Sequence, residues 1–102
     1  MIEIKNLRTE KPTKEFDVRV DRSSVLGNPF RMASEDKRDE TCDKYAEYFQ
    51  IKAVSDPIFA AELDRIDSLY VIHGKINLFC WCTPKRCHSE TIMKYIQRKK
   101  QY

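Results

Sequence analysis

Most of the residues that could do chemistry lie in one short segment. Three of the four cysteines and one of the two histidines fall within nine positions, at Cys80, Cys82, Cys87 and His88. Thiolates and imidazoles are preferred zinc ligands, so these side chains are candidates for a Cys₃His zinc site. The spacing is awkward for zinc, because Cys80 and Cys82 lie about 6.6 Å apart along an extended strand, and the other two ligands tend to diverge at a helix start. We therefore expect no cofactor, with zinc at these four residues as the alternative.

The same segment also fits a reactive thiol. Cys82 and Cys87 are predicted to lie near a helix N-terminus beside basic side chains, which lowers the pKa of a thiol. Cys80 and Arg86 are separated by five residues, as in cysteine phosphatases, yet the loop between them has no glycine to direct backbone N–H groups at a phosphate. No base with an orienting partner is evident for a nucleophile. Catalysis by one of these cysteines stays open, and no catalytic residue is assigned.

A strand and a helix are needed to position this segment. Residues 76–82 are apolar on both faces, which is typical of a strand inside a parallel sheet that is covered on both sides. A turn with Pro84 follows, and a helix is predicted from Pro84 or Cys87 onward. A helix start presents unpaired N–H groups and a partial positive charge. The turn is therefore one half of a predicted binding site.

The other half is a loop that follows an earlier strand. Alternating apolar residues predict a half-buried strand over residues 16–20, and the loop DRSSVLGNPF comes directly after it. We expect Gly27 to adopt a positive φ and Asn28, which precedes a proline, to be extended. The free backbone N–H groups of this loop, with Arg22 and Ser24 close by, predict a cradle for an anion.

Two helices are predicted between the strands. Apolar residues at helical spacing mark one helix from about residue 39 to residue 54 and place Cys42 in the core. Asp56 followed by Pro57 predicts the start of a second helix, and Gly74 predicts its end. The connection between the two strands is therefore long and helical.

This order of elements predicts the fold class. Strands joined by helices pair in parallel through right-handed crossovers, and in such sheets ligands bind at the carboxyl ends of the strands. With a short edge strand at residues 1–7, we expect one compact α/β domain over residues 1–102, a Rossmann-like sandwich with a small, mainly parallel sheet flanked by helices. Both loops then face one crevice. The predicted ligand-binding residues are Arg22, Ser24, Gly27, Asn28, Cys82, Pro84, Cys87 and His88.

The composition indicates a soluble globular protein. The chain has 102 residues, of which 41% are hydrophobic and 34% charged, and this suits one domain with a modest core. No apolar run is long enough to cross a bilayer and no signal-peptide core is present, so we expect a cytoplasmic protein with reduced thiols and no membrane partner. The charge is uneven, with a net −4 over residues 31–70 and a net +6 over residues 71–102. The basic C-terminal end is a candidate surface for nucleic acid or another protein.

Two motifs make the chain similar to a known family. An arginine shortly before LGNPF is followed much later by the pattern L-x-C-x-C-x-P-x-x-C-H, which leads into a predicted helix. These motifs resemble the DUF4326 family of small bacterial and phage proteins, and the resemblance spans about residues 16–97. The matching positions are Arg22, Leu26, Gly27, Asn28, Pro29, Phe30, Cys80, Cys82, Pro84, Cys87 and His88. The resemblance implies a compact α/β shape and no established reaction, and the charged segment 33–40, which departs from it, is expected to alter access to the crevice.

Two functional hypotheses follow. The first is binding of a small anionic, nucleotide-related ligand in the crevice, by a bacterial or phage accessory protein that works in the cytoplasm, or in the host cytoplasm if phage-encoded. Arg22, Asn28 and His88 are expected to donate hydrogen bonds, and Trp81 and Phe30 to offer flat surfaces. The alternative is a zinc-stabilised interaction domain that binds nucleic acid or a protein partner through its basic end. Neither hypothesis decides whether the protein is an enzyme or an oligomer.

Overall fold

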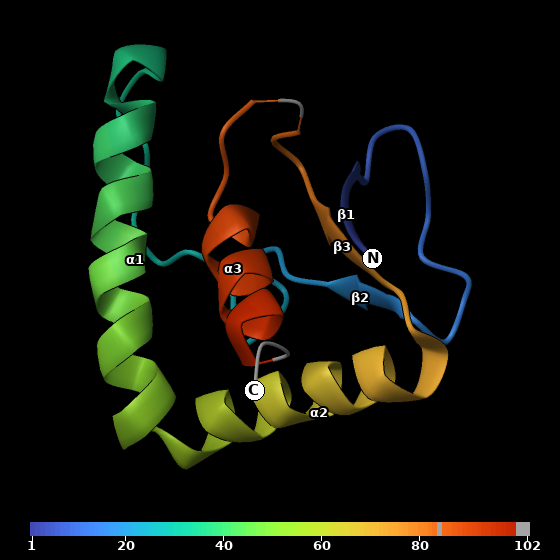
Figure 1. Ribbon diagram of the computed structural model, residues 1–102. Coiled ribbons are helices and arrows are strands. Elements are labelled where there is room, and N and C mark those ends of the chain that lie inside the picture. Colours follow the sequence, from blue (N-terminus) through green and yellow to red (C-terminus); the bar gives the residue numbers. More distant parts are fainter. Residues whose placement is uncertain (84, 100–102) are drawn as a thin grey trace.

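The computed structural model describes residues 1–83 and 85–99. These residues form three strands, a short 3₁₀ helix and three α-helices, arranged as a parallel sheet with helices packed around it (Figure 1). The elements are β1 (Ile2–Asn6), β2 (Asp17–Arg19), η1 (Glu35–Lys37), α1 (Arg38–Ser55), α2 (Pro57–His73), β3 (Ile76–Cys80) and α3 (Ser89–Lys99). The predicted α/β class and parallel sheet are confirmed. Three strands in the order β1-β3-β2 do not establish the narrower Rossmann-like arrangement.

The central strand of the sheet is β3, and both of its neighbours run parallel to it. Leu78 at its middle pairs with Ile4 of β1 on one side and with Val18 of β2 on the other. All five residues of β3 are buried, as expected for a strand covered on both faces. The strand ends at Cys80 and not at Cys82 as predicted, so the chain turns before the second cysteine.

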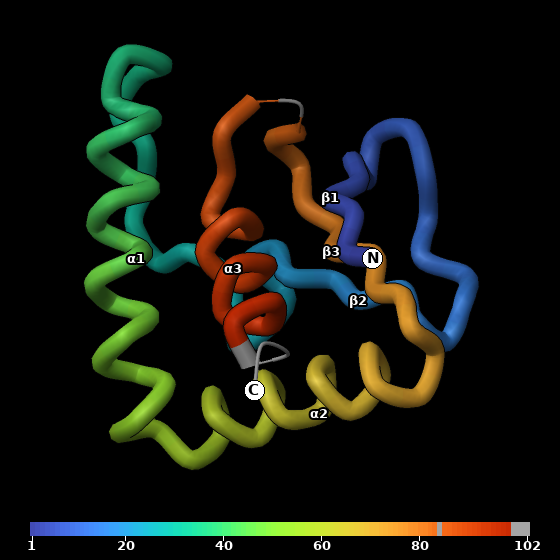
Figure 2. The backbone as a smooth tube through the Cα atoms, in the orientation of Figure 1, coloured from blue at the N-terminus to red at the C-terminus, as the bar shows by residue number. Residues whose placement is uncertain are grey.

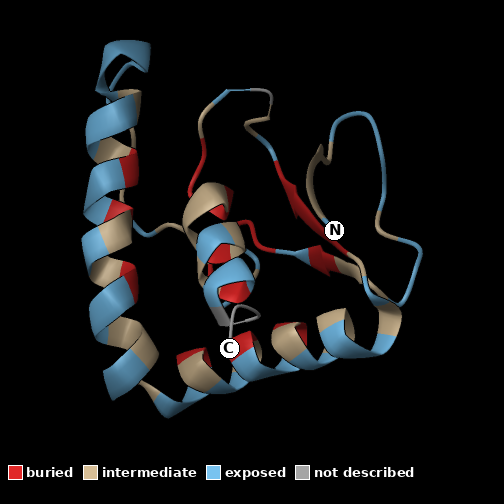
Figure 3. Ribbon diagram, viewed as in Figure 1, coloured by how far each residue is buried: buried red, intermediate tan, exposed pale blue. Residues whose placement is uncertain are grey.

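The helices enclose the sheet and share one apolar core. In Figure 1, α3 lies between α1 and the sheet, and α2 runs below them. The buried positions of α1 and α2 lie on the sides of these helices that face the rest of the protein (Figure 3). Aromatic rings join the three helices: Phe49 lies 5.4 Å from Phe59 of α2 and 5.3 Å from Tyr95 of α3, centroid to centroid. Cys42 is 6% exposed on α1, which confirms its predicted burial.

The ends of α2 follow from local residue chemistry. The Asp56 carboxylate accepts hydrogen bonds from the N–H groups of Ile58 and Phe59, and Pro57 occupies the first helical position. Gly74 ends the helix in the left-handed region, with φ of 68°. Both predicted boundaries of this helix are therefore confirmed. None of the helices in the described part of the chain is long and apolar enough to cross a membrane.

The connections bring the two sequence motifs to one region. After β2 the chain passes behind α3 before it reaches α1 (Figure 2), and after β3 it returns to the start of α3. Because β2 and β3 are parallel neighbours, the loops that follow them leave from the same edge of the sheet. This arrangement places the LGNPF loop, the cysteine-rich turn and the start of α1 around one pocket.

Candidate functional site

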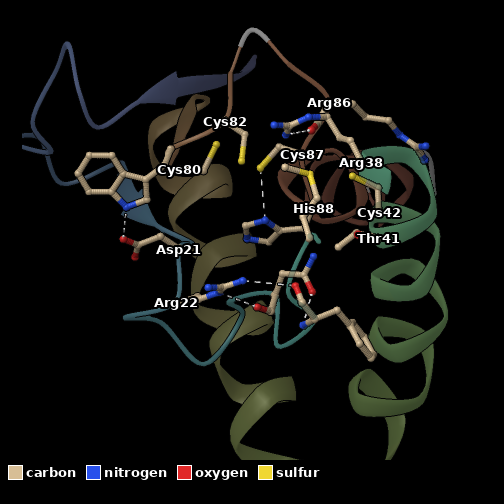
Figure 4. A pocket seen from close by; sticks show the side chains of 14 residues that line it. Asp21, Arg22, Arg38, Thr41, Cys42, Cys80, Cys82, Arg86, Cys87 and His88 are labelled. Atoms are coloured by element: carbon tan, nitrogen blue, oxygen red, sulfur yellow. Dashed lines mark hydrogen bonds between the residues drawn. The ribbon is translucent and has the colours of Figure 1, made fainter. Parts of the chain in front are cut away.

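A pocket of about 220 Å³ lies at the carboxyl ends of β2 and β3 (Figure 4). Its walls come from the loop after β2, the turn after β3 and the first turns of α1. The lining residues are Asp21, Arg22, Asn28, Phe30, Met32, Arg38, Thr41, Cys42, Cys80, Trp81, Cys82, Arg86, Cys87 and His88. The two loops that the sequence predicted to share a crevice thus line the same pocket.

The predicted site residues fall into three groups. Those that line the pocket are Arg22, Asn28, Cys82, Cys87 and His88. Ser24 and Gly27 line an adjoining hollow of about 300 Å³, together with Pro29 and Arg31 and again with Arg22 and Asn28. Pro84 lies outside the described residues.

The LGNPF loop is folded on itself and is not an open cradle. The N–H of Ser24 donates to the Asp21 carbonyl at 2.9 Å, and that of Gly27 to the Ser24 carbonyl at 3.0 Å. The N–H of Phe30 donates to Oδ1 of Asn28 at 2.9 Å. For these three N–H groups the predicted availability to an anion is wrong, because the loop uses them to hold its own shape.

Gly27 is required for close approach and not for a special backbone angle. Among the described residues only Gly74 has a positive φ, so the predicted positive φ at Gly27 is wrong. A Cβ at position 27 would lie 2.6 Å from Cα of Arg22 and 2.6 Å from the carbonyl oxygen of Asp21. The loop closes against its own beginning at this point, and only a residue without a side chain fits there.

Arg22 clamps the loop from its exposed side. Its Nε donates to the carbonyl of Asn28 at 3.2 Å, and one terminal nitrogen donates to the carbonyl of Phe30 at 3.3 Å. Tyr45 of α1 holds the same loop from the core, where its hydroxyl donates to the Leu26 carbonyl at 2.7 Å. The guanidinium is therefore fixed at the rim of the pocket by the loop that it stabilises.

Asp21 is a buried carboxylate that positions Trp81. The indole Nε1 donates to Asp21 at 2.9 Å, and Arg19 and Ser23 donate to the same carboxylate. Burial alone acts to raise the pKa of Asp21, but the hydrogen bonds from Arg19, Ser23 and Trp81 outweigh it and hold that pKa well below its ordinary value. Trp81 is thus anchored by its nitrogen while 48% of the residue stays exposed.

Three cysteine side chains meet where β3 ends and α3 begins (Figure 4). Their sulfur atoms lie next to one another in Figure 4, and the side chain of Cys87 interacts with those of Cys80 and Cys82. The Cys87 sulfur also lies 3.5 Å from the Ser89 hydroxyl oxygen. The interaction with Cys87 is the largest cause that lowers the pKa of Cys80 and of Cys82, and the same two neighbours raise the pKa of Cys87.

His88 is a buried side chain whose two ring nitrogens both contact the protein. Nε2 lies 2.5 Å from the carbonyl of Val20, and Nδ1 lies 3.3 Å from the Cys87 sulfur. A carbonyl can only accept, so Nε2 carries the proton and Nδ1 accepts from the Cys87 thiol. Burial lowers the pKa of His88 and favours this neutral form. His88 therefore links β2 to the thiols, in contrast to the expectation that it donates to a ligand.

Arg38 is a site residue that the sequence did not reveal. Two of its nitrogens donate to the Glu35 carboxylate, and NH1 donates to the Arg86 carbonyl at 2.9 Å. After the larger effect of Cys87, Arg38 also contributes to the lowered pKa of the Cys82 thiol. Arg38 comes from the charged segment 33–40, where nothing in the spacing distinguishes it from other exposed charges.

Arg86 does not serve the cysteines as a phosphatase arginine would. Its terminal nitrogens donate to Asp39 at 3.1 Å and to Asp43 at 3.0 Å, both on α1. Two N–H groups in the first turn of α3 are also occupied, since Glu90 donates to the Cys87 carbonyl and Thr91 to the His88 carbonyl. These two amides are therefore not available to an anion in the pocket.

The zinc alternative finds no preformed site. Within residues 1–83 and 85–99, no group of three or more His, Cys, Asp or Glu side chains is arranged to hold a metal ion. The three cysteine side chains nevertheless lie next to one another in Figure 4, and His88 turns Nδ1 toward Cys87. Zinc at Cys80, Cys82, Cys87 and His88 stays an untested alternative.

Comparisons with known proteins agree with the motifs. Neither the curated proteins nor the solved structures yield a match to this chain. A family model described as a domain of unknown function, DUF4326, matches residues 4–98. Since this match spans most of the chain and both loops of the pocket, the chain belongs to the DUF4326 family.

Proposed function

We propose that the pocket binds a small anionic, nucleotide-related ligand. The observation that carries the proposal is the state of Arg22, an exposed arginine that lines both the pocket and the adjoining hollow. No carboxylate lies within ion-pair distance of it in the part of the chain that the structure describes. Its positive charge is therefore available to a ligand.

The other arginines that line the pocket differ from Arg22 in this respect. Arg38 binds Glu35 through two nitrogens, and Arg86 forms ion pairs with Asp39, Asp43 and Glu90. Their charges are offset by neighbouring carboxylates. Arg22 instead donates two of its five N–H groups to neutral carbonyls, which fix its plane and leave three donors for a phosphate or carboxylate.

Asn28 supplies a second donor at the same rim. Its Oδ1 accepts from the N–H of Phe30, which directs the amide nitrogen away from that contact. Nδ2 has no hydrogen-bond partner among the described residues. Because both Asn28 and Arg22 line the pocket, one small anion could accept hydrogen bonds from both side chains.

Trp81 and the pocket size favour a flat ligand of limited size. The indole is held by Asp21 and exposes almost half of its surface, so its face is available for stacking on a planar ring. A volume of about 220 Å³ is below the range typical of drug-sized ligands. These features suit a base with a nearby phosphate better than a dinucleotide.

The alternative proposal is a zinc-stabilised domain that uses its basic C-terminal end on nucleic acid or a protein. Residues 100–102 of that end lie outside the described residues. We include in the favoured proposal a cytoplasmic setting, in a bacterium or in the host of a phage. The two proposals differ in which cationic residues they require.

Fluorescence titration tests the proposal directly, because Trp81 is the only tryptophan. We expect AMP, ADP or inorganic phosphate to change its emission in a saturable way. Arg22→Lys should weaken binding at least about tenfold, or 1.4 kcal/mol, since lysine lacks the planar fork. Asn28→Asp is the sharper variant: it keeps the oxygen that accepts from Phe30 and replaces the free donor with negative charge. It should weaken binding by at least the same factor.

Two control variants distinguish an effect of the site residues from the effect of removing positive charge elsewhere on the protein. Arg65→Gln removes one positive charge on α2, where Arg65 binds Glu62, and should leave the affinity unchanged. The double variant Lys99→Gln/Lys100→Gln removes charge from the basic end and should also bind normally. If the double variant abolishes binding while Arg22→Lys and Asn28→Asp do not, the basic end is the working surface.

A further inference from the structure

The thiol cluster of Cys80, Cys82 and Cys87 could be oxidised, a property that the proposed ligand binding does not use. The sulfur atoms of Cys80, Cys82 and Cys87 lie next to one another in Figure 4, and the side chain of Cys87 interacts with those of the other two. Cys42, the fourth cysteine, lies on α1 and has no hydrogen bond to the cluster in the described structure. Three reduced thiols in contact are one oxidation step from a disulfide.

The three thiols differ in access to small molecules. All three line the pocket, but Cys82 is half-buried, whereas Cys80 and Cys87 are 1% and 4% exposed. The Arg38 guanidinium lines the same pocket, and a nearby positive charge favours a thiolate. Cys82 is thus the thiol that a small oxidant in the pocket would meet first.

Cys87 is placed to react with an oxidised Cys82. Its side chain lies next to that of Cys82 in Figure 4, and its sulfur lies 3.3 Å from Nδ1 of His88. The Val20 carbonyl holds the other ring nitrogen, so the acceptor nitrogen faces the thiol. His88 therefore supplies the base and Val20 its orienting partner, a pair that was not evident from the sequence.

We propose that Cys82 and Cys87 form a reversible oxidation site, in which a hydroperoxide in the pocket oxidises Cys82 and Cys87 closes a disulfide. The proposal rests on the contacts and relative access of these thiols, and it does not depend on the ligand-binding proposal. Cys80 takes no covalent part, because it is the most buried of the three.

The chemistry proceeds in two balanced steps. The Cys82 thiolate attacks the terminal oxygen of a hydroperoxide, the O–O bond breaks, and the alkoxide or hydroxide takes a proton and leaves. Cys82 becomes a sulfenic acid, so its sulfur is oxidised by two electrons and the peroxide is reduced by two. Cys87 then passes its proton to His88 and attacks the Cys82 sulfur. The S–O bond breaks, and hydroxide leaves as water with that proton. A dithiol reductant returns two electrons and restores both thiols.

Peptide mapping of the full-length protein tests the proposal. Reduced protein is treated with hydrogen peroxide, the remaining thiols are alkylated, and the product is digested with trypsin. Cleavage after Lys85 and Arg86 places Cys82 and Cys87 on different peptides, so only a disulfide can join them. We expect this linked pair in the wild type and its loss after treatment with a dithiol.

Single serine variants identify the partners, since Cys80 and Cys82 share one tryptic peptide. The linked pair should persist in Cys80→Ser and in Cys42→Ser and be lost in Cys82→Ser. Cys87→Ser should instead accumulate a sulfenic acid on Cys82, detected by dimedone. If the linked pair survives in Cys82→Ser and disappears in Cys80→Ser, the disulfide forms through Cys80 and the proposal names the wrong thiol. Thiols that react only after treatment with a chelator would overturn the proposal in favour of bound zinc.

Discussion

Gly27 tests whether close backbone contact shapes the LGNPF loop. A Cβ at this position would lie 2.6 Å from two main-chain atoms, Cα of Arg22 and the carbonyl oxygen of Asp21. Rotation of a side chain cannot relieve either contact, so the backbone itself has to move. Overpacking of this kind costs about 1–3 kcal/mol, and we expect Gly27→Ala to lower the free energy of unfolding by about 2 kcal/mol. The shift should also weaken ligand binding, because the Arg22 clamp spans the same loop.

Gly74 offers a matched control, because position 74 requires glycine for its backbone angle and not for lack of space. Its φ is 68°, and a Cβ there would meet nothing within 4 Å. A left-handed conformation costs an L-residue about 1–2 kcal/mol, but asparagine adopts it more readily than alanine. Gly74→Asn should therefore be less destabilising than Gly74→Ala. At Gly27 the order should reverse, since the larger asparagine side chain worsens the clash.

Urea unfolding followed by Trp81 fluorescence measures all four variants in one assay. Near-wild-type stability of Gly27→Ala would refute the steric account of the loop. The same conclusion would follow if Gly27→Asn were more stable than Gly27→Ala, because that order indicates a requirement for a backbone angle.

Two further predictions concern the same site. Tyr45→Phe should lower the free energy of unfolding by about 1–3 kcal/mol, since the buried Leu26 carbonyl loses its donor. Tyr48→Phe is the control, because the Tyr48 hydroxyl has no hydrogen-bond partner among the described residues. If both variants lose the same stability in urea unfolding, this reasoning is contradicted. The urea midpoint should also fall from pH 8 to pH 5. In the folded protein the pKa values of His88, Cys80 and Cys82 lie below their ordinary values, which are those of the unfolded chain. The stability that these groups contribute is therefore complete when the pH is above the ordinary pKa values, and it is lost as the pH falls toward the folded ones. The raised pKa of Cys87 does not contribute in this interval, because the thiol is protonated in both states. A midpoint that rises on acidification would show that the signs assigned to these pKa shifts are wrong.

Residue patterns were sufficient to predict the elements and the meeting of the two loops. Asp56, Pro57 and Gly74 act through local backbone chemistry, which a short stretch of sequence carries in full. The apolar residues of β3 predicted a strand covered on both sides, and a parallel sheet then requires both loops to leave one edge. These predictions needed no knowledge of distant contacts.

The details of the site depend on contacts that the sequence does not contain. Spacing suggested that Cys80 and Cys82 are held apart by an extended strand, but β3 ends at Cys80 and the turn brings both sulfurs to Cys87. Arg38 reaches Cys82 only because the charged segment packs over the turn, where Arg38 donates to the Arg86 carbonyl. Such placements follow from tertiary packing, so residue type and spacing could not reveal them.

The two proposals share a pocket, and this links their free energies. In the reduced protein Arg38 and Cys82 line the same pocket, and the positive charge of Arg38 favours the Cys82 thiolate. A disulfide between Cys82 and Cys87 is neutral, so oxidation would remove this negative charge from the lining that Cys82 shares with Arg22. An anion would then bind the oxidised form more tightly than the reduced form. Because coupling between two sites is reciprocal, the same anion would favour the disulfide by the same factor. An anion without this effect would have to bind at the adjoining hollow, where Arg22 and Arg31 lie but Cys82 does not.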